Sequence, residues 1–298
     1  MRVCGNEIKV TGRLLRVARL DAEKYQFLED PETLINALPK SGVRADLFTF
    51  LQGLPETEPK YKYPMEWDNL AVLPVSNFDN WWTKQVDAKT RNMVRKAEKK
   101  AVTLREVPFD DSLVHGIWRI YNETPFRQGK PFSHYGKDLE VVREEEATYL
   151  DRSIFIGAFL GDELVGFIKI VTNESRTQAG LMNIVSLVQH RDKAPTNALV
   201  AQAVRACADR GISYLVYSNF AYGKKQRDTL SDFKKNNGFQ RIDLPRYYVP
   251  LTPLGKAAFH LGFHKKFADR FPEPMMAKLR DLRNAWYNRK SHTVAEAS

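Results

Sequence analysis

The sequence has little cysteine and no long apolar run. Only two cysteines occur among 298 residues, Cys4 and Cys207, and they lack the spacing of metal ligands or of a disulfide framework. No stretch of about twenty apolar residues is present, so no transmembrane helix is expected. Residues 1–20 carry basic side chains but neither a continuous apolar core nor a small-residue cleavage site, which argues against a secretory signal. These absences predict a cytoplasmic protein.

The composition favours a globular chain with anionic partners. Apolar residues make up 43% of the sequence, which excludes a disordered chain. Lysine and arginine number 46 against 36 acidic residues, so the formal net charge is +10. A charge of this sign suits a nucleotide cofactor, a nucleic acid or an anionic membrane surface, and it does not choose among them.

The first third of the sequence predicts a mixed α/β arrangement. Residues 30–42 (DPETLINALPKSG) predict a helix. Asp30 caps its start, Pro31 fits the first position and Gly42 follows its end. Strand-like runs between turns occupy residues 7–17, 45–53 and 69–76. We expect an N-terminal subdomain over residues 1–105.

A basic segment follows at residues 87–107 (DAKTRNMVRKAEKKAVTLREV). Arg91, Arg95 and Lys99 recur at i, i+4 and i+8, so a helix here would carry one strongly basic face. Two interpretations are open: a solvated surface, and a surface that binds an anion.

The clearest fold pattern lies in the second half. Three consecutive strands with short turns, an antiparallel meander, are predicted at residues 153–160, 163–171 and 179–189. A helix, a strand, a helix and a last strand are then predicted at residues 195–211, 212–220, 228–238 and 239–251.

The loop between the meander and the next helix reads RDKAPTNALVAQAVRACADRG. Thr196 and Asn197 are good capping types, and Pro195 fits a first helical turn without wasting a donor. The N–H groups of that turn lack intrahelical partners and carry partial positive charge, so a phosphate suits them, and Arg191 and Lys193 add charge. A well-capped structural helix would show the same features. Cys207 falls on the apolar face of this predicted helix, as a core residue does.

The order of these elements, with TRNMVRKAEKKAV and LSDFKKNNGFQ, resembles the GNAT acyltransferase superfamily and most of all its FemAB-like branch. The resemblance covers residues 85–250. It implies an α/β (α+β) fold with a mainly antiparallel sheet flanked by helices, in two tandem GNAT-like subdomains of which residues 1–105 would be a degenerate copy. Residues 106–250 would form the acyltransferase domain, and residues 251–298 a basic amphipathic helical tail. Ala101 stands where the family pattern usually has glycine.

The resemblance implies acyl transfer to an amine, with acyl-CoA, most simply acetyl-CoA, as co-substrate and no metal. The implied donor-binding residues are Val188, Arg191, Lys193, Ala194, Thr196 and Asn197. Ala194 and Asn197 replace glycines of the family signature, and their side chains would crowd a close backbone approach. FemAB-like enzymes that take aminoacyl-tRNA also often lack this signature, so a tRNA donor is the alternative.

Acyl transfer needs a group that receives the amine proton and an acid for the leaving group. The family commonly uses tyrosine as the acid, which points to Tyr222 first and to Tyr217 and Asn219 beside it. Aromatic residues in strands more often serve packing.

The acceptor side is expected in the polar loop PFRQGKPFSHYGKD, where Arg127, His134 and Tyr135 would line a pocket. The acceptor is expected to be a small-molecule or cell-envelope amine. A third hypothesis is a non-catalytic basic protein that binds nucleic acid or a membrane surface. The tail, with phenylalanines at steps of four from Phe259, fits either packing on the domain or peripheral contact with a membrane.

Overall fold

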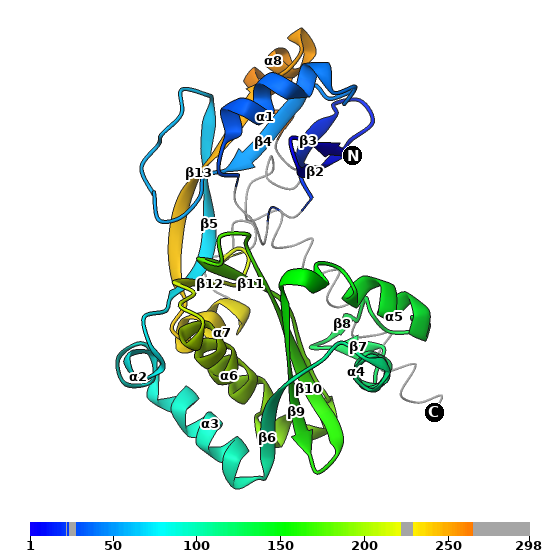
Figure 1. Ribbon diagram of the computed structural model, residues 1–298, viewed down its shortest axis with the longest axis vertical. Coiled ribbons are helices and arrows are strands. Elements are labelled where there is room, and N and C mark those ends of the chain that lie inside the picture. Colours follow the sequence, from blue (N-terminus) through cyan, green and yellow to red (C-terminus); the bar gives the residue numbers. More distant parts are fainter. Residues whose placement is uncertain (22, 24–27, 222–228, 265–298) are drawn as a thin grey trace.

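The computed structural model describes residues 1–21, 23, 28–221 and 229–264. Its main feature is one eleven-stranded sheet with the order β1-β2-β3-β4-β13-β5-β12-β11-β10-β9-β6 (Figure 1). A separate two-stranded hairpin lies in the loop that was expected to bind the acceptor. The mixed α/β class with a mainly antiparallel sheet is therefore confirmed.

The N-terminal half contributes five strands and a short helix. Its elements are β1 (Arg2–Val3), β2 (Asn6–Thr11), β3 (Val17–Leu20), α1 (Pro31–Ala37), a 3-10 turn (Leu38–Lys40), β4 (Leu47–Leu51) and β5 (Met65–Pro74). The predicted cap is present, because the carboxylate of Asp30 accepts from the N–H of Thr33 at 3.1 Å. Gly42 has a φ of +77°, a conformation that glycine adopts without strain.

The second half contains the remaining elements. They are α2 (Phe78–Asn80), a π-helical turn (Trp81–Gln85), α3 (Ala88–Lys99), β6 (Val102–Val107), α4 (Asp111–Tyr121), β7 (Phe126–Arg127), β8 (Lys130–Pro131), α5 (Leu139–Glu146), a 3-10 turn (Leu150–Arg152), β9 (Ser153–Leu160), β10 (Glu163–Thr172), β11 (Gln178–Ser186), the 3-10 helix η4 (Val188–Lys193), α6 (Pro195–Asp209), β12 (Tyr214–Val216), α7 (Thr229–Asn236), β13 (Gln240–Pro250) and α8 (Pro253–His260).

The predicted meander is confirmed as β9, β10 and β11, which pair antiparallel. Beyond it, β11 and β12 run parallel but pair only from Gln178↔Tyr214 to Gly180↔Val216. Past that point β11 continues to Ser186 paired with β10 only, whereas the chain after β12 stays beside β5: the Tyr217 N–H donates to the Ala71 carbonyl at 2.8 Å. The two strands therefore diverge on the side where β11 leads into η4.

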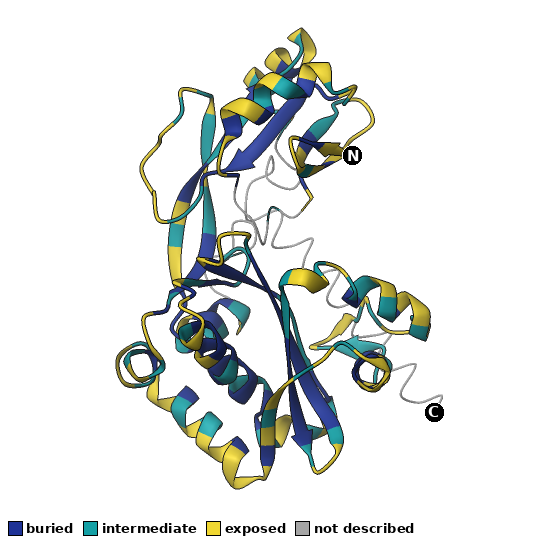
Figure 2. Ribbon diagram, viewed as in Figure 1, coloured by how far each residue is buried: buried dark blue, intermediate teal, exposed yellow. Residues whose placement is uncertain are grey.

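Helices cover both faces of the second half of the sheet (Figure 1). On one face α6 packs on β9, β10 and β11, and α3 lies outside it against α6. On the other face α4 packs on β10, and α5 packs on α4. Figure 2 shows that α6 and the central strands are largely buried while α3 is largely exposed. The core of this half is continuous from Ala71 in β5 to Phe239 before β13.

The basic segment at 87–107 forms two elements instead of one helix. Helix α3 ends at Lys99, Ala101 takes a φ of +58°, and β6 then pairs with β9. The subdomain boundary that we expect near residue 105 falls inside β6, and it stays a prediction. Of the expected tail, residues 265–298 lie outside the described residues.

Candidate functional site

The candidate site is the corner where β11 ends and α6 begins. Between them, η4 forms a short 3-10 helix, and Ala194 then takes a φ of +55° as the residue before α6. Glycine is the usual residue in this left-handed conformation, because it has no Cβ to crowd the backbone. Ala194 is buried.

The first N–H groups of this corner are taken by a side chain of the protein. The carboxylate of Glu123 accepts from the Val188 N–H at 2.7 Å and from the Gln189 N–H at 3.0 Å. Further along, the His190 N–H donates to the Leu187 carbonyl and the Ala194 N–H to the Arg191 carbonyl. The loop thus satisfies its own donors instead of presenting them to a diphosphate.

Arg127 fixes the Glu123 carboxylate in place. Its guanidinium donates to Glu123 at 3.1 Å, to the Ile120 carbonyl at 2.8 Å and to the Ser186 carbonyl at 2.7 Å. Both charged side chains are largely buried, and burial lowers the pKa of Arg127 while Glu123 opposes that shift. Arg127 therefore joins α4 to the end of β11, and its predicted role in binding an acceptor stays a prediction.

The helix start itself keeps some capacity for an anion. In the described part of the chain the N–H groups of Thr196 and Asn197 have no recorded acceptor, as expected for a first helical turn. The Thr196 hydroxyl is instead 2.9 Å from the Ser186 hydroxyl. Arg191 is exposed, and the Lys193 ammonium lies 3.1 Å from Nδ1 of His190. Two N–H groups and the side-chain charges of Arg191 and Lys193 remain there, and the donor-binding role of this corner stays a prediction.

On the acceptor side, His134 lies inside the α4–α5 loop. Its ring centroid is 4.2 Å from that of Tyr121, and its Nδ1 is 3.2 Å from the ammonium of Lys137. Lys137 also bonds both oxygens of Glu145 at 2.6 Å. Burial, with the nearby Lys137 charge, lowers the pKa of His134, so the neutral imidazole is favoured. Tyr135 is 46% exposed and stands outside this group.

A buried polar network lies beneath His134. The Glu146 carboxylate accepts from the Tyr121 hydroxyl at 2.8 Å and from the Asn183 amide at 2.7 Å. The Lys169 ammonium donates to the backbone carbonyl of Glu146 at 2.7 Å and to that of Thr148 at 2.8 Å. Burial raises the pKa of Glu146 and lowers that of Lys169 to about 8. Glu146 ends the acidic run Glu144–Glu146, and nothing in that pattern indicates that it is buried.

Solved structures with the same arrangement of elements identify the fold. The C-terminal domain of a putative lysylphosphatidylglycerol synthetase from Agrobacterium fabrum is 10% identical, with a TM-score of 0.55 over 85% of this chain and 83% of that one. L-PGS from Bacillus licheniformis is 14% identical, with a TM-score of 0.54 over 86% and 85%. FemX is 12% identical, with a TM-score of 0.52 over 79% and 72%.

The chain has the GNAT fold of these proteins. The resemblance in TRNMVRKAEKKAV and LSDFKKNNGFQ predicted this fold, and the comparison confirms it. A scan against known protein families finds no match for the sequence, and a search of curated proteins finds none either.

Within this GNAT fold the proposed catalytic residues lie after β12, beside β5. Tyr217 packs against Phe239, and the ammonium of Lys234 lies 4.7 Å from its ring centroid. Asn219 bonds Asp68 and the Asn69 carbonyl. These contacts tie the end of β12 to β5 and α7. Tyr222 lies outside the described residues, and the catalytic role of all three stays a prediction.

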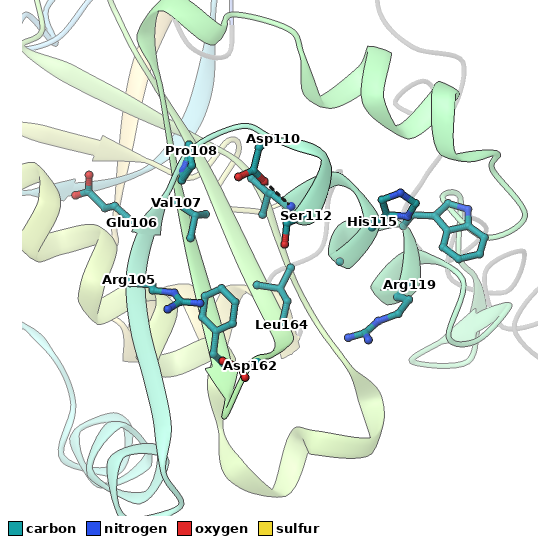
Figure 3. Close-up of a pocket in the computed structure, with 14 residues that line it drawn as sticks. Arg105, Glu106, Val107, Pro108, Asp110, Ser112, His115, Arg119, Asp162 and Leu164 are labelled. Atoms are coloured by element: carbon teal, nitrogen blue, oxygen red, sulfur yellow. Dashed lines mark hydrogen bonds between the residues drawn. The ribbon is translucent and has the colours of Figure 1, made fainter.

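A cavity of about 690 Å³ lies elsewhere in the GNAT fold, between α4, β6 and the β9–β10 turn. Figure 3 shows Ser112 and Leu164 facing it, with Arg105 and Arg119 on opposite sides. The Arg105 guanidinium lies 4.1 Å from the ring centroid of Phe159. None of the predicted site residues lines this cavity.

The described residues contain no group of three or more His, Cys, Asp or Glu side chains arranged to hold a metal ion. Across the same residues, every helix is too short or too polar to span a bilayer.

Proposed function

We propose that the protein transfers an aminoacyl group from aminoacyl-tRNA to an amine. In this reaction the neutral amine attacks the ester carbonyl, the new C–N bond forms and the ester C–O bond breaks. The amine loses one proton, and the 3′-terminal ribose of the tRNA leaves as an alcohol with a proton. This proposal narrows the acyltransferase chemistry that the fold resemblance implies.

The observation that carries the choice of donor is the position of Glu123. An acyl-CoA diphosphate at the β11–α6 corner would lie near a carboxylate held by two backbone N–H groups and by Arg127. Like charges in a partly buried site repel strongly, and removing Glu123 would leave Arg127 without its ion-pair partner. An aminoacyl ester carries no diphosphate next to its acyl group, so it does not meet this carboxylate.

The α4–α5 loop supports the acceptor side of the proposal. His134 is held by its contact with Tyr121 and by Lys137, and its lowered pKa keeps it neutral near pH 7. A neutral imidazole is the form that receives a proton, directly or through one water. The Lys137 ammonium donates to Nδ1 of His134, so we assign His134 to receiving the proton at Nδ1 once the amine of the acceptor takes the place of Lys137. We assign Glu145, beside Lys137, to attraction of a cationic acceptor.

The test compares two donors by calorimetry. We expect a bulk mixture of aminoacylated tRNA to bind with a micromolar Kd, and CoA to give no binding heat at about 1 mM. A double variant, Lys193→Glu with Thr196→Glu, places negative charge at the helix start. If the wild-type protein binds CoA at micromolar concentration and this double variant does not, the corner is a diphosphate site and the donor is acyl-CoA.

A further inference from the structure

The outer face of α3 and α6 carries an unusual concentration of positive charge. The sequence of α3, AKTRNMVRKAEK, holds five basic residues and one acidic residue. One of these, Arg91, donates from its guanidinium to the carbonyls of Trp82 and Val86 at 3.1 and 2.6 Å, so Arg91 stabilises the local fold. The side chains of Lys89, Arg95, Lys96 and Lys99 are exposed, and Lys100 continues the charge at the helix end.

Two arginines on this face are held by aromatic rings. Phe78 and Trp82 stack with centroids 5.9 Å apart and planes 16° apart. The Arg95 guanidinium lies 5.5 Å from the Trp82 ring centroid, and that of Arg205, on α6, lies 3.8 Å from the Phe78 centroid. Contact with a ring fixes the plane of a guanidinium without using its N–H donors. We call Phe78, Trp82, Arg95 and Arg205 the arginine–aromatic cluster.

The two guanidiniums of the cluster keep their donors available. Among the described residues neither has a carboxylate within ion-pair distance, and the one side-chain hydrogen bond of Arg95 is a 3.5 Å contact with Asn92. Two other arginines are paired instead: the half-buried Arg143 with Asp111 at 2.7 Å and the exposed Arg210 with Glu106 at 2.7 Å. Ordered, unpaired guanidiniums are suited to bidentate contacts with phosphate oxygens.

This face lacks what a membrane-binding helix needs. A helix that lies in a bilayer interface buries large apolar side chains. None of the exposed large apolar residues of the described chain belongs to α2, α3 or α6. The charge and planar donors therefore favour a phosphodiester chain over a lipid surface.

The face also leads to the candidate site. Helix α3 packs on α6, whose first turn forms the corner, and α3 contacts η4 as well. Figure 1 shows α3 lying along the outside of α6. Arg191 is exposed on η4, so positive charge continues from α3 to the corner.

We propose that the arginine–aromatic cluster, with the exposed lysines of α3, binds the phosphate backbone of the donor RNA. This inference rests on the proposed function, since it names the surface that holds the tRNA whose 3′ end reaches the corner. Arg95 and Arg205 each contact a phosphate, and the lysines supply sequence-independent attraction.

The test measures binding of one deacylated tRNA, because that probe reports on the surface without the aminoacyl group. We expect Arg95→Ala with Arg205→Ala to weaken binding at least ten-fold at about 0.15 M salt. The slope of log K against log salt should fall by about two. The matched control, Arg2→Ala with Arg19→Ala, removes the same charge from exposed positions in the N-terminal strands and should leave binding within about two-fold.

A third variant, Arg95→Lys with Arg205→Lys, keeps the charge and loses the planar fork, so we expect only partial recovery of binding. Equal weakening by the cluster variant and the control would overturn the inference. So would binding to vesicles with anionic lipid that depends on the cluster, with no binding to tRNA. If the cluster binds tRNA but aminoacylation adds nothing to affinity, the inference stands and the proposed function fails.

Discussion

Lys169 lies within β10 with its ammonium group wholly enclosed. Its three acceptors are the backbone carbonyls of Glu146 and Thr148 and the Thr148 hydroxyl. These bonds join the end of α5 to the centre of the sheet beneath His134. A buried charge held in this way is costly to desolvate, and its low pKa of about 8 reflects that cost.

The pH dependence of folding tests this enclosure. The pKa of Lys169 is about 8 in the folded protein against 10.5 ordinarily, so the unfolded chain binds the proton more tightly. The cost to folding stability of burying the charged Lys169 is therefore fully present below pH 8, and it disappears as the pH rises toward 10.5. We expect this group to raise the free energy of unfolding by about 3 kcal/mol over that range. Urea unfolding of wild type and Lys169→Met at several pH values measures it, and an identical pH dependence would contradict the assignment.

Single residues also show what the sequence can and cannot reveal about the site. Pro195, Thr196 and Asn197 have local chemistry that predicts a helix start, and α6 does begin at Pro195. The predicted capping by Thr196 or Asn197 is wrong, because the N-cap is Ala194 and no side chain caps the helix. Glu123 could not be found in this way, because it lies 65 residues before Val188 and reaches the corner only through the packing of α4. The left-handed φ of +55° at Ala194 explains why the family signature has glycine there, and the predicted crowding of a donor by Ala194 and Asn197 stays a prediction.

Helix α8 packs closely on the backbone just before β4, and Gly255 lies at the point of closest approach. A Cβ at Gly255 would lie 1.8 Å from the backbone carbonyl oxygen of Asp46, which already accepts from the Leu251 N–H. Backbone cannot move aside as a flexible side chain does. We expect Gly255→Ala to destabilise the fold by about 1–3 kcal/mol despite the better helix propensity of alanine. Thermal unfolding measures this, with exposed Lys256→Ala as the control. An unchanged Tm for Gly255→Ala would refute the packing described.

The elements that the sequence predicted well are those with strong local patterns. The meander consists of continuous apolar runs separated by short turns, and helix α6 has a clear apolar face. The basic segment was harder, because its residues fit one long helical pattern until Ala101 breaks it. The strand predicted over 212–220 is short as β12, Tyr214–Val216, and Ser218 just beyond it takes a left-handed φ of +50° that interrupts the extended chain.

At the scale of the whole molecule, one sheet joins the two halves of the chain. Strand β5 lies between β12 and β13, pairing Leu73 with Leu215 and Leu70 with Ile242. No local pattern predicts such a neighbour, because the pairing joins residues that are far apart in the sequence. This is why the sequence suggested a boundary near residue 105 and could not show β5 inside the second half.

The continuous sheet predicts cooperative unfolding. Separating residues 1–105 from the rest would expose β5, whose Leu73 is fully buried in the core of the second half. We therefore expect a single calorimetric transition with equal van't Hoff and calorimetric enthalpies. Two resolved transitions would show instead that the N-terminal part folds as an independent unit.

The choice of donor is tested most directly by comparing one tRNA in its charged and deacylated forms. The aminoacyl ester should add affinity beyond that of the RNA backbone through contacts on the side of His134. We predict that the aminoacylated form binds at least ten-fold more tightly, and that about 1 mM CoA does not displace it. Equal affinity for both forms, or displacement by CoA, would contradict an aminoacyl-tRNA donor.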